Sequence, residues 1–190
     1  HLNNLDSYLV AFSFYTSCLV MALPSSRVLR ITGYKKGMSL GLLIMSLGAL
    51  LFIPAAYQRS YQLFLSGLFV QGTGLAILQT ASNPYITILG PMESAARRIS
   101  IMGICNGIAG ITAPLILGAI TLRNADAIKA SIISMPAIEK AKVLDQLAHR
   151  VITPYGLMAF ILAGLAILIF FSGLPELDAD AEDETVASAN

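Results

Sequence analysis

Long apolar stretches alternate with short polar segments along this chain. Apolar windows of about 20 residues, the length that spans a bilayer as a helix, recur between clusters of charge. Most of these stretches lack the polar face that a helix of a soluble protein turns toward water. The pattern therefore predicts an all-α membrane protein with five transmembrane helices. We expect these helices at residues 8–28, 38–57, 62–89, 99–122 and 154–174.

Two segments differ from this pattern. Residues 123–152 place apolar side chains at roughly helical spacing with charged ones between them, which predicts one or two short amphipathic helices, broken at Pro136, on the outer surface. Residues 176–190 hold six of the 11 acidic side chains. This composition predicts a disordered acidic tail in the cytoplasm. Residues 1–175 would then form the transmembrane bundle.

The composition and the loop charges extend this interpretation. Apolar residues make up 56% and charged residues 12% of the chain, whereas about a quarter is charged in ordinary globular proteins. Basic side chains gather in two short loops, one with Lys35 and Lys36 and one with Arg97 and Arg98. Because such loops stay in the cytoplasm, the N-terminus is predicted outside and the tail inside. The basic excess belongs to membrane loops and indicates no nucleic-acid partner.

Patterns typical of soluble enzymes do not occur in this sequence. It has no glycine-rich phosphate loop, no CxxC pair and no paired histidines, and His1 and His149 are not placed for a metal site. Cys18 and Cys105 lie in apolar stretches, where cysteine packs as a small hydrophobe. We therefore expect no catalytic residue, no metal site, no cofactor and no enzymatic activity.

Polar side chains recur along the third predicted span. Gln71, Gln79 and Asn83 follow steps of four or eight residues, which keeps them near one face with a drift of about 40° per four residues. Amides in a bilayer are costly unless bonded, so they should face a bundle interior or a watery cavity. They both donate and accept hydrogen bonds, as a neutral sugar requires. The alternative is that they bond neighbouring helices.

Proline and glycine mark places where the helices would bend or approach. Pro84 removes one backbone donor beside the amides and predicts a kink there. On the fourth span, Gly103 and Gly107 form a GxxxG pair that Gly110 continues, a pattern typical of helices that approach closely or slide. Asn106 is the only amide on that span and would face the same packed or cavity side.

Two runs of residues resemble a known family. RITGYKKG, which contains Gly33, Lys35 and Lys36, resembles the cytoplasmic loop motif of the major facilitator superfamily. QTASNPYITILGPMESAARRISIMGICN resembles the fourth-to-fifth helix region of its fucose–galactose–glucose:proton symporter family, and in particular the bacterial glucose/galactose transporters. The resemblance implies that the spans are helices two to six of a twelve-helix fold. The chain would be a partial N-terminal bundle without helix one and the C-terminal six-helix half.

The resemblance also implies a function and roles for single residues. It implies symport of glucose or galactose, or of fucose, with protons across the bacterial inner membrane, and no cofactor. The position of Gln79 is an acid implicated in proton coupling in the fucose branch, so a coupling carboxylate is expected in helix one instead. A sugar-binding glutamine of that branch aligns with Gly103, the next asparagine with Asn106, and the family's asparagine before proline with Asn83. The usual acid of the loop motif aligns with Arg30, which implies the loss of a cytoplasmic latch.

A second hypothesis places the chain in another class. It would be a truncated membrane remnant that transports nothing and acts only as a structural piece. In-frame helices in the flanking genomic sequence would favour the transporter, and stop codons on both sides would favour the remnant. A carrier of the same superfamily for another substrate is a third hypothesis, which competing sugars would separate from the first.

Overall fold

The computed structural model describes residues 4–58, 60–121 and 137–175. These ranges contain helices and no strand, and five helices hold a stretch long and apolar enough to cross a membrane. This confirms the prediction of an all-α protein with five spanning helices. The elements are α1 (Asn4–Thr32), α2 (Tyr34–Gln58), α3 (Tyr61–Ile88), the 3₁₀ turn η1 (Met92–Ser94), α4 (Ala95–Thr121) and α6 (Ala137–Phe171).

The fifth helix is longer than its predicted span. α6 runs unbroken for 35 residues and continues through Pro154, where the sequence predicted a start. Residues 137–152, expected in separate surface helices, are its first turns. Proline is tolerated inside membrane helices because neighbouring groups satisfy the freed carbonyl. The remainder of the surface segment, its predicted break at Pro136 and the tail at 176–190 lie outside the described residues.

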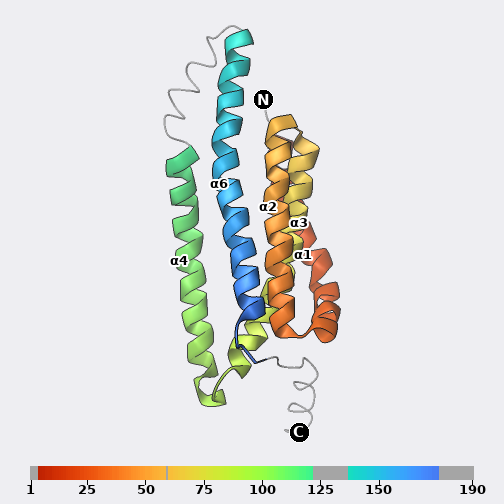
Figure 1. The fold of residues 1–190 in the computed structure, drawn as a ribbon, viewed down its shortest axis with the longest axis vertical. Helices are drawn as coiled ribbons and strands as arrows, with labels where there is room; N and C mark the ends of the chain where they lie inside the picture. Colours follow the sequence, from red (N-terminus) through yellow and green to blue (C-terminus); the bar gives the residue numbers. More distant parts are fainter. Residues whose placement is uncertain (1–3, 59, 122–136, 176–190) are drawn as a thin grey trace.

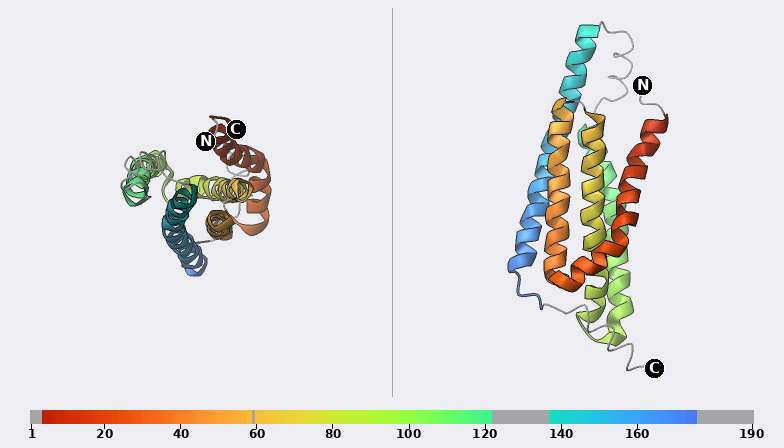
Figure 2. Two further views of the ribbon diagram at one scale, coloured as in Figure 1. Left: turned by 90° about the horizontal axis from the view of Figure 1, so that it is seen from above. Right: turned by 90° about the vertical axis from the view of Figure 1, so that its right-hand side faces the viewer.

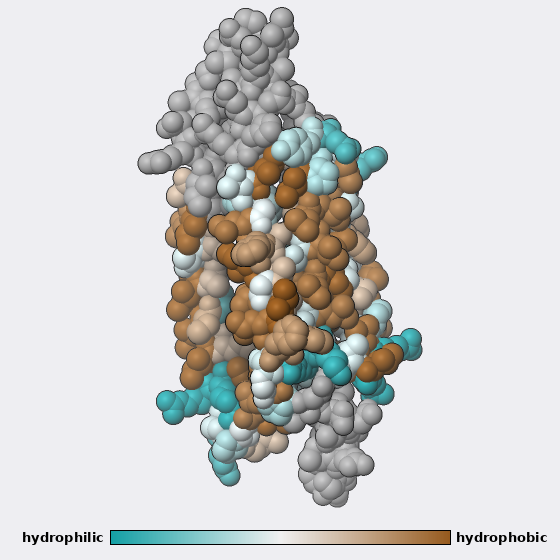
Figure 3. Space-filling model, viewed as in Figure 1, coloured by the Kyte–Doolittle hydropathy of each residue, from teal (hydrophilic) through white to brown (hydrophobic). Residues whose placement is uncertain are grey.

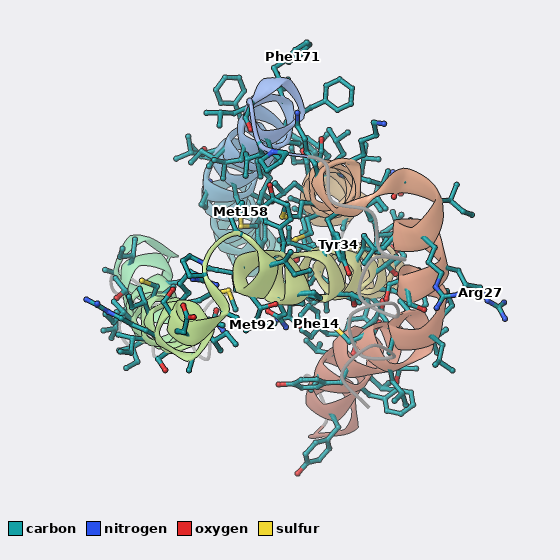
Figure 4. The ribbon with its side chains drawn as sticks, turned by 90° about the horizontal axis from the view of Figure 1, so that it is seen from below. Phe14, Arg27, Tyr34, Met92, Met158 and Phe171 are labelled. Carbon is teal, nitrogen blue, oxygen red and sulfur yellow. The ribbon has the colours of Figure 1, made fainter. Side chains whose placement is uncertain are left out.

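Four of the helices pack side by side, and α4 stands apart from them. α2 lies between α3 and α6, and α3 lies between α2 and α1 (Figure 2). α4 is set apart from this row when the bundle is seen along its length (Figure 4), and none of its apolar stretch is buried. The α1–α2 turn, the α3–α4 turn and the end of α6 lie at the same end of the bundle (Figure 1).

The structure of the α1–α2 turn gives a role to Gly33 and Lys35 of the motif RITGYKKG. Gly33 alone separates the two helices, and its φ of 77° lies in the left-handed region that glycine adopts without strain. Its N–H donates to the carbonyl of Leu29 at 2.8 Å, which caps α1. The Lys35 Nζ donates to the carbonyl of Ser172 at 2.6 Å. The motif therefore makes a tight turn and ties it to the end of α6.

The backbones of α2 and α3 touch at two pairs of glycines. Gly41 lies against Gly74, and Gly48 lies against Gly67. A Cβ atom added to Gly74 would lie 2.6 Å from the Gly41 oxygen and 2.7 Å from the Met45 nitrogen. Small residues permit such approach in membranes, where packing and hydrogen bonds hold helices together.

A second seam on α2 is made by serines. Ser39 donates to the carbonyl of Ala166 at 2.9 Å, and Ser46 donates to that of Ala159 at 2.8 Å. Both serines and both alanines are buried. The partners are seven residues apart on each helix, which is the period of antiparallel helices packed as in a coiled coil. α2 therefore presents glycines to α3 and serines to α6, and both sets repeat every seven residues.

Hydroxyl groups also join α1 to α3. The Ser17 Oγ lies 2.8 Å from the Thr73 Oγ1, and the Ser25 Oγ lies 3.1 Å from the Thr80 Oγ1. Ser17 and Ser25 are fully buried. These polar groups are satisfied inside the bundle, as hydroxyls in a lipid environment must be.

The seam between α2 and α6 gives a testable prediction. Replacing Ser46 by alanine should remove one interhelical hydrogen bond and lower the stability by about 0.6 kcal/mol, and by at most about 1.7 kcal/mol. Thermal unfolding in detergent would measure the change. Ser66→Ala is the matched control, because Ser66 is exposed and donates only to Leu63 of its own helix. Equal shifts in the two variants would contradict a role for this seam.

The outer surface is that of a membrane protein. On the face shown in Figure 3, an apolar band covers the middle of the bundle, and hydrophilic residues lie mainly toward its two ends. Large apolar side chains such as Leu19, Leu23, Phe160 and Leu168 are mostly exposed. Such a surface is stable only against lipid or further helices.

Candidate functional site

Gln79 and Asn83 lie on the face of α3 that no described helix covers. Gly67 and Gly74 of α3 face α2, and Thr73 and Thr80 face α1. Gln79 and Asn83 are exposed, and neither makes a hydrogen bond with the described residues. Four residues separate them, so they are about 40° apart on the helix. The structure therefore brings these two amides together on one open polar face.

Gln71 lies apart from this pair. It is partly buried, and a Cβ atom on Gly48 would meet its backbone nitrogen at 2.8 Å and its side-chain Cγ at 2.9 Å. Gln71 and Gln79 are two steps of four residues apart, and each step adds a drift of about 40° around the helix. Gln71 therefore points toward α2, while Gln79 lies on the open face. A substrate-binding role of Gln71 stays a prediction, and its position favours packing between α2 and α3.

Asn106 is placed on α4 near the same open side. It is exposed and follows Met102 by one turn. Met102 lines an apolar cavity of about 260 Å³ together with Ser82 and Ile86 of α3. Since residues four apart share a helix face, Asn106 lies toward the side on which α4 approaches α3. No hydrogen bond joins it to the α3 amides within the described residues.

The glycines of α4 do not pack against any described part of the chain. A Cβ atom added at Gly103, Gly107 or Gly110 would meet no such atom within 4 Å. Close approach to another helix was the role that the sequence favoured for them, and no described helix makes that contact, so this role stays a prediction. The described helices make no such contact because α4 stands beside the bundle, with none of its apolar stretch buried. Their role in conformational change also stays a prediction.

Sequence reasoning missed the glycines that do bring helices together. They belong to α2 and α3, and a signal for them exists in the sequence. SLGLLIM at residues 39–45 is followed directly by SLGALLF at residues 46–52, a repeat of seven residues that places serine and glycine at equivalent positions. Gly67 and Gly74 show the same spacing on α3. Matching periods on consecutive helices would have predicted the seam.

Pro84 lies inside α3, which continues to Ile88. Asn83 is exposed on one side of it, and Tyr85 is buried on the other and donates to the carbonyl of Pro175 at 3.0 Å. The proline therefore sits between the polar face and the buried cluster of Leu29, Tyr34, Met38, Ala81 and Tyr85. Tyr34 points into this cluster between α2 and α3 (Figure 4). A hinge role of Pro84 stays a prediction.

The open face offers hydrogen bonds without charge. The five candidate spans contain neither Asp nor Glu inside their apolar stretches, apart from Glu93 in the α3–α4 turn. In the described part of the chain, no three His, Cys, Asp or Glu side chains lie close enough to hold a metal ion. Neutral amides on a membrane helix can bind a ligand rich in hydroxyl groups.

Five helices of membrane-spanning length, one of which carries two uncharged amides on an open face, are typical of an integral membrane protein, a class that includes secondary transporters. The sequence profile described as "Major Facilitator Superfamily" matches residues 1–184. The chain belongs to this superfamily. The expected family is thereby confirmed, and the fold is a partial helical bundle of that architecture.

The chain is similar to bacterial sugar transporters. It is 35% identical over 179 residues to the glucose/galactose transporter of Brucella abortus, and this match covers 94% of the present chain and 40% of that protein. It is 32% identical over 180 residues to the L-fucose-proton symporter of Escherichia coli K12, covering 94% and 41%. The crystal structure of an E. coli fucose:proton symporter matches with a TM-score of 0.79 at 30% identity, covering 92% and 43%. The chain spans about two fifths of the length of these relatives.

Proposed function

We propose that this chain is part of a proton-coupled monosaccharide symporter, with glucose or galactose as the favoured substrate and fucose as the alternative. The observation that carries the proposal is the open face of α3, where Gln79 and Asn83 project without a partner among the described residues. Amides arranged in this way, with no carboxylate beside them, suit the hydroxyl groups of a sugar. Relatives described as sugar transporters support the same class of substrate.

The proposal assigns the remaining machinery to other segments. Helix one and a second six-helix half would complete the site, because transporters of this kind bind substrate near the midplane between two halves. The coupling ion would be a proton, as in the L-fucose-proton symporter of E. coli. Its carboxylate would lie on helix one, since α3 carries Gln79 at the position that is an acid in the fucose branch.

The proposed location is the bacterial inner membrane. The α1–α2 and α3–α4 turns lie at one end of the bundle, and the α2–α3 turn lies at the other (Figure 1). In the sequence, the first two turns are flanked by Arg27, Lys36 and Arg97, whereas a single base lies between α2 and α3. Short basic loops stay in the cytoplasm. The N-terminus would therefore lie outside, and the end of α6 would lie in the cytoplasm.

Uptake of labelled hexose tests the proposal. Cells that express the protein at its full length should accumulate labelled glucose or galactose, and a protonophore should abolish the accumulation. Competition by unlabelled glucose, galactose and fucose would rank the substrates. Uptake no greater than in cells with an empty vector would contradict the proposal and favour the transport-incompetent remnant.

A further inference from the structure

Arg98, near the start of α4, directs its whole guanidinium at the preceding turn. Its Nε donates to the carbonyl of Ile86 at 2.8 Å, and its Nη2 donates to those of Thr87 at 2.7 Å and Gly90 at 3.4 Å. Its Nη1 donates to the carbonyl of Pro91 at 3.1 Å and to the Ser94 hydroxyl. An arginine side chain has five N–H donors. All five are therefore directed at oxygen atoms of the residues between Ile86 and Ser94.

The carbonyl oxygens of Ile86 and Thr87 are among the groups that the end of a helix leaves without a partner. The last four carbonyls of an α-helix have no partner within it, and α3 ends at Ile88. The Leu89 N–H takes the Tyr85 carbonyl at 3.0 Å. Arg98 takes the next two, and its positive charge lies where the helix dipole favours a cation. A side chain of α4 thus caps α3.

Little else in the described residues fixes α4 against α3. No residue of its apolar stretch is buried, and from Ile99 to Ile116 only Met102 is partly covered. Gly90 is part of the Arg98 arrangement, because a Cβ atom there would lie 3.0 Å from Nη1 and 3.4 Å from Cζ. The guanidinium rests against the turn so closely that a side chain at position 90 would shift it by a few tenths of an ångström.

We propose that Arg98 is a positioning residue of the transporter, which fixes the direction in which α4 leaves α3 and thereby places Asn106 relative to Gln79 and Asn83. The proposal rests on the function proposed above. It separates Arg98 from its neighbour Arg97, which is exposed and makes no hydrogen bond with the described residues. Both arginines add the same charge to the same turn, and only Arg98 joins two helices.

Variants of the full-length membrane protein test this directly. Spin labels at the exposed positions Gln62 on α3 and Leu115 on α4, in a C18A/C105A background, report the angle between the two helices. Arg98→Gln should broaden the distance distribution, and it should raise the KM for hexose severalfold while most of kcat remains, because displaced groups lose contact with the ligand. Arg97→Gln should leave both measurements as in the wild type.

Two further variants test whether the hydrogen-bond geometry of Arg98, rather than its charge or an effect on folding, accounts for these changes. Arg98→Lys keeps the charge but not the planar fork of donors, so it should behave like Arg98→Gln. Gly90→Ala should shift the guanidinium by a few tenths of an ångström with Arg98 unchanged. It should change both measurements in the same direction but by less, and it keeps the test open if Arg98→Gln does not accumulate. Full recovery by lysine, or equal results for Arg97→Gln and Arg98→Gln, would overturn the proposal. If the wild type carries no hexose, the proposed function fails, and the distances still decide whether Arg98 fixes α4.

Discussion

Replacing Gly74 by alanine should destabilise the bundle strongly. The new Cβ atom would lie 2.6 Å from the Gly41 oxygen and 2.7 Å from both the nitrogen and the Cγ of Met45. Two of these three atoms belong to the backbone of α2, so relief requires the helices to separate. Overpacking of this kind costs typically about 1–3 kcal/mol. Thermal unfolding of the purified protein in detergent should show a clearly lower midpoint.

The chain offers a matched control for this change. Gly164 of α6 is exposed, and a Cβ atom there would meet no described atom within 4 Å. Gly164→Ala makes the same chemical change at an open position, where alanine has the higher helix propensity. We expect an unchanged or slightly higher midpoint. A Gly74→Ala protein as stable as the wild type would contradict the close backbone contact of α2 and α3 at this position.

Replacing Gln79 by alanine should weaken hexose uptake several-fold. The amide projects from the open face of α3, where it can donate to one sugar oxygen and accept from another. Loss of one neutral hydrogen bond costs about 0.5–1.5 kcal/mol, which corresponds to at most about a tenfold change in affinity. Initial rates over a range of sugar concentrations would show the effect mainly in KM.

Gln62 gives the matched control on the same helix. It is also an exposed glutamine, but it lies in the first turn of α3, far from the amide pair. Gln62→Ala should leave uptake unchanged, and both variants should reach the membrane in equal amounts by immunoblot. Unchanged uptake in Gln79→Ala would remove Gln79 from the binding site, although the class of transporter would stand.

The fold was largely predictable because membrane helices leave a strong signal. Apolar windows of bilayer length located all five helices, with most ends within about four residues, the usual uncertainty of such boundaries. α6 was placed too short, because Pro154 was taken as a helix start and the charged residues before it as a separate surface segment. Helix ends in soluble proteins commonly lie next to proline, whereas α6 continues through Pro154, because neighbouring groups in a membrane bundle can satisfy the freed carbonyl.

The candidate site was predictable only along one helix. Spacing on α3 was enough to pair Gln79 with Asn83, because both positions depend on helix geometry alone. It misplaced Gln71, whose position depends on where α2 lies. The glycines of α4 matched a packing pattern that described helices do not use, while those of α2 and α3 meet because two chain segments happen to share a period. Contacts between helices depend on pairs of positions, and a pattern within one segment does not specify its partner.

The shared period of α2 has a consequence for insertions and deletions. Gly41 and Gly48 meet α3 while Ser39 and Ser46 meet α6, so one helix is in register with two neighbours at once. Loss or gain of a single residue within SLGLLIMSLGALLF would rotate everything beyond it by about 100° and disrupt both seams together. A duplication of one seven-residue repeat within this run would rotate everything beyond it by only about 20°. Length changes in α2 should therefore be tolerated in natural relatives as multiples of seven residues and otherwise be absent.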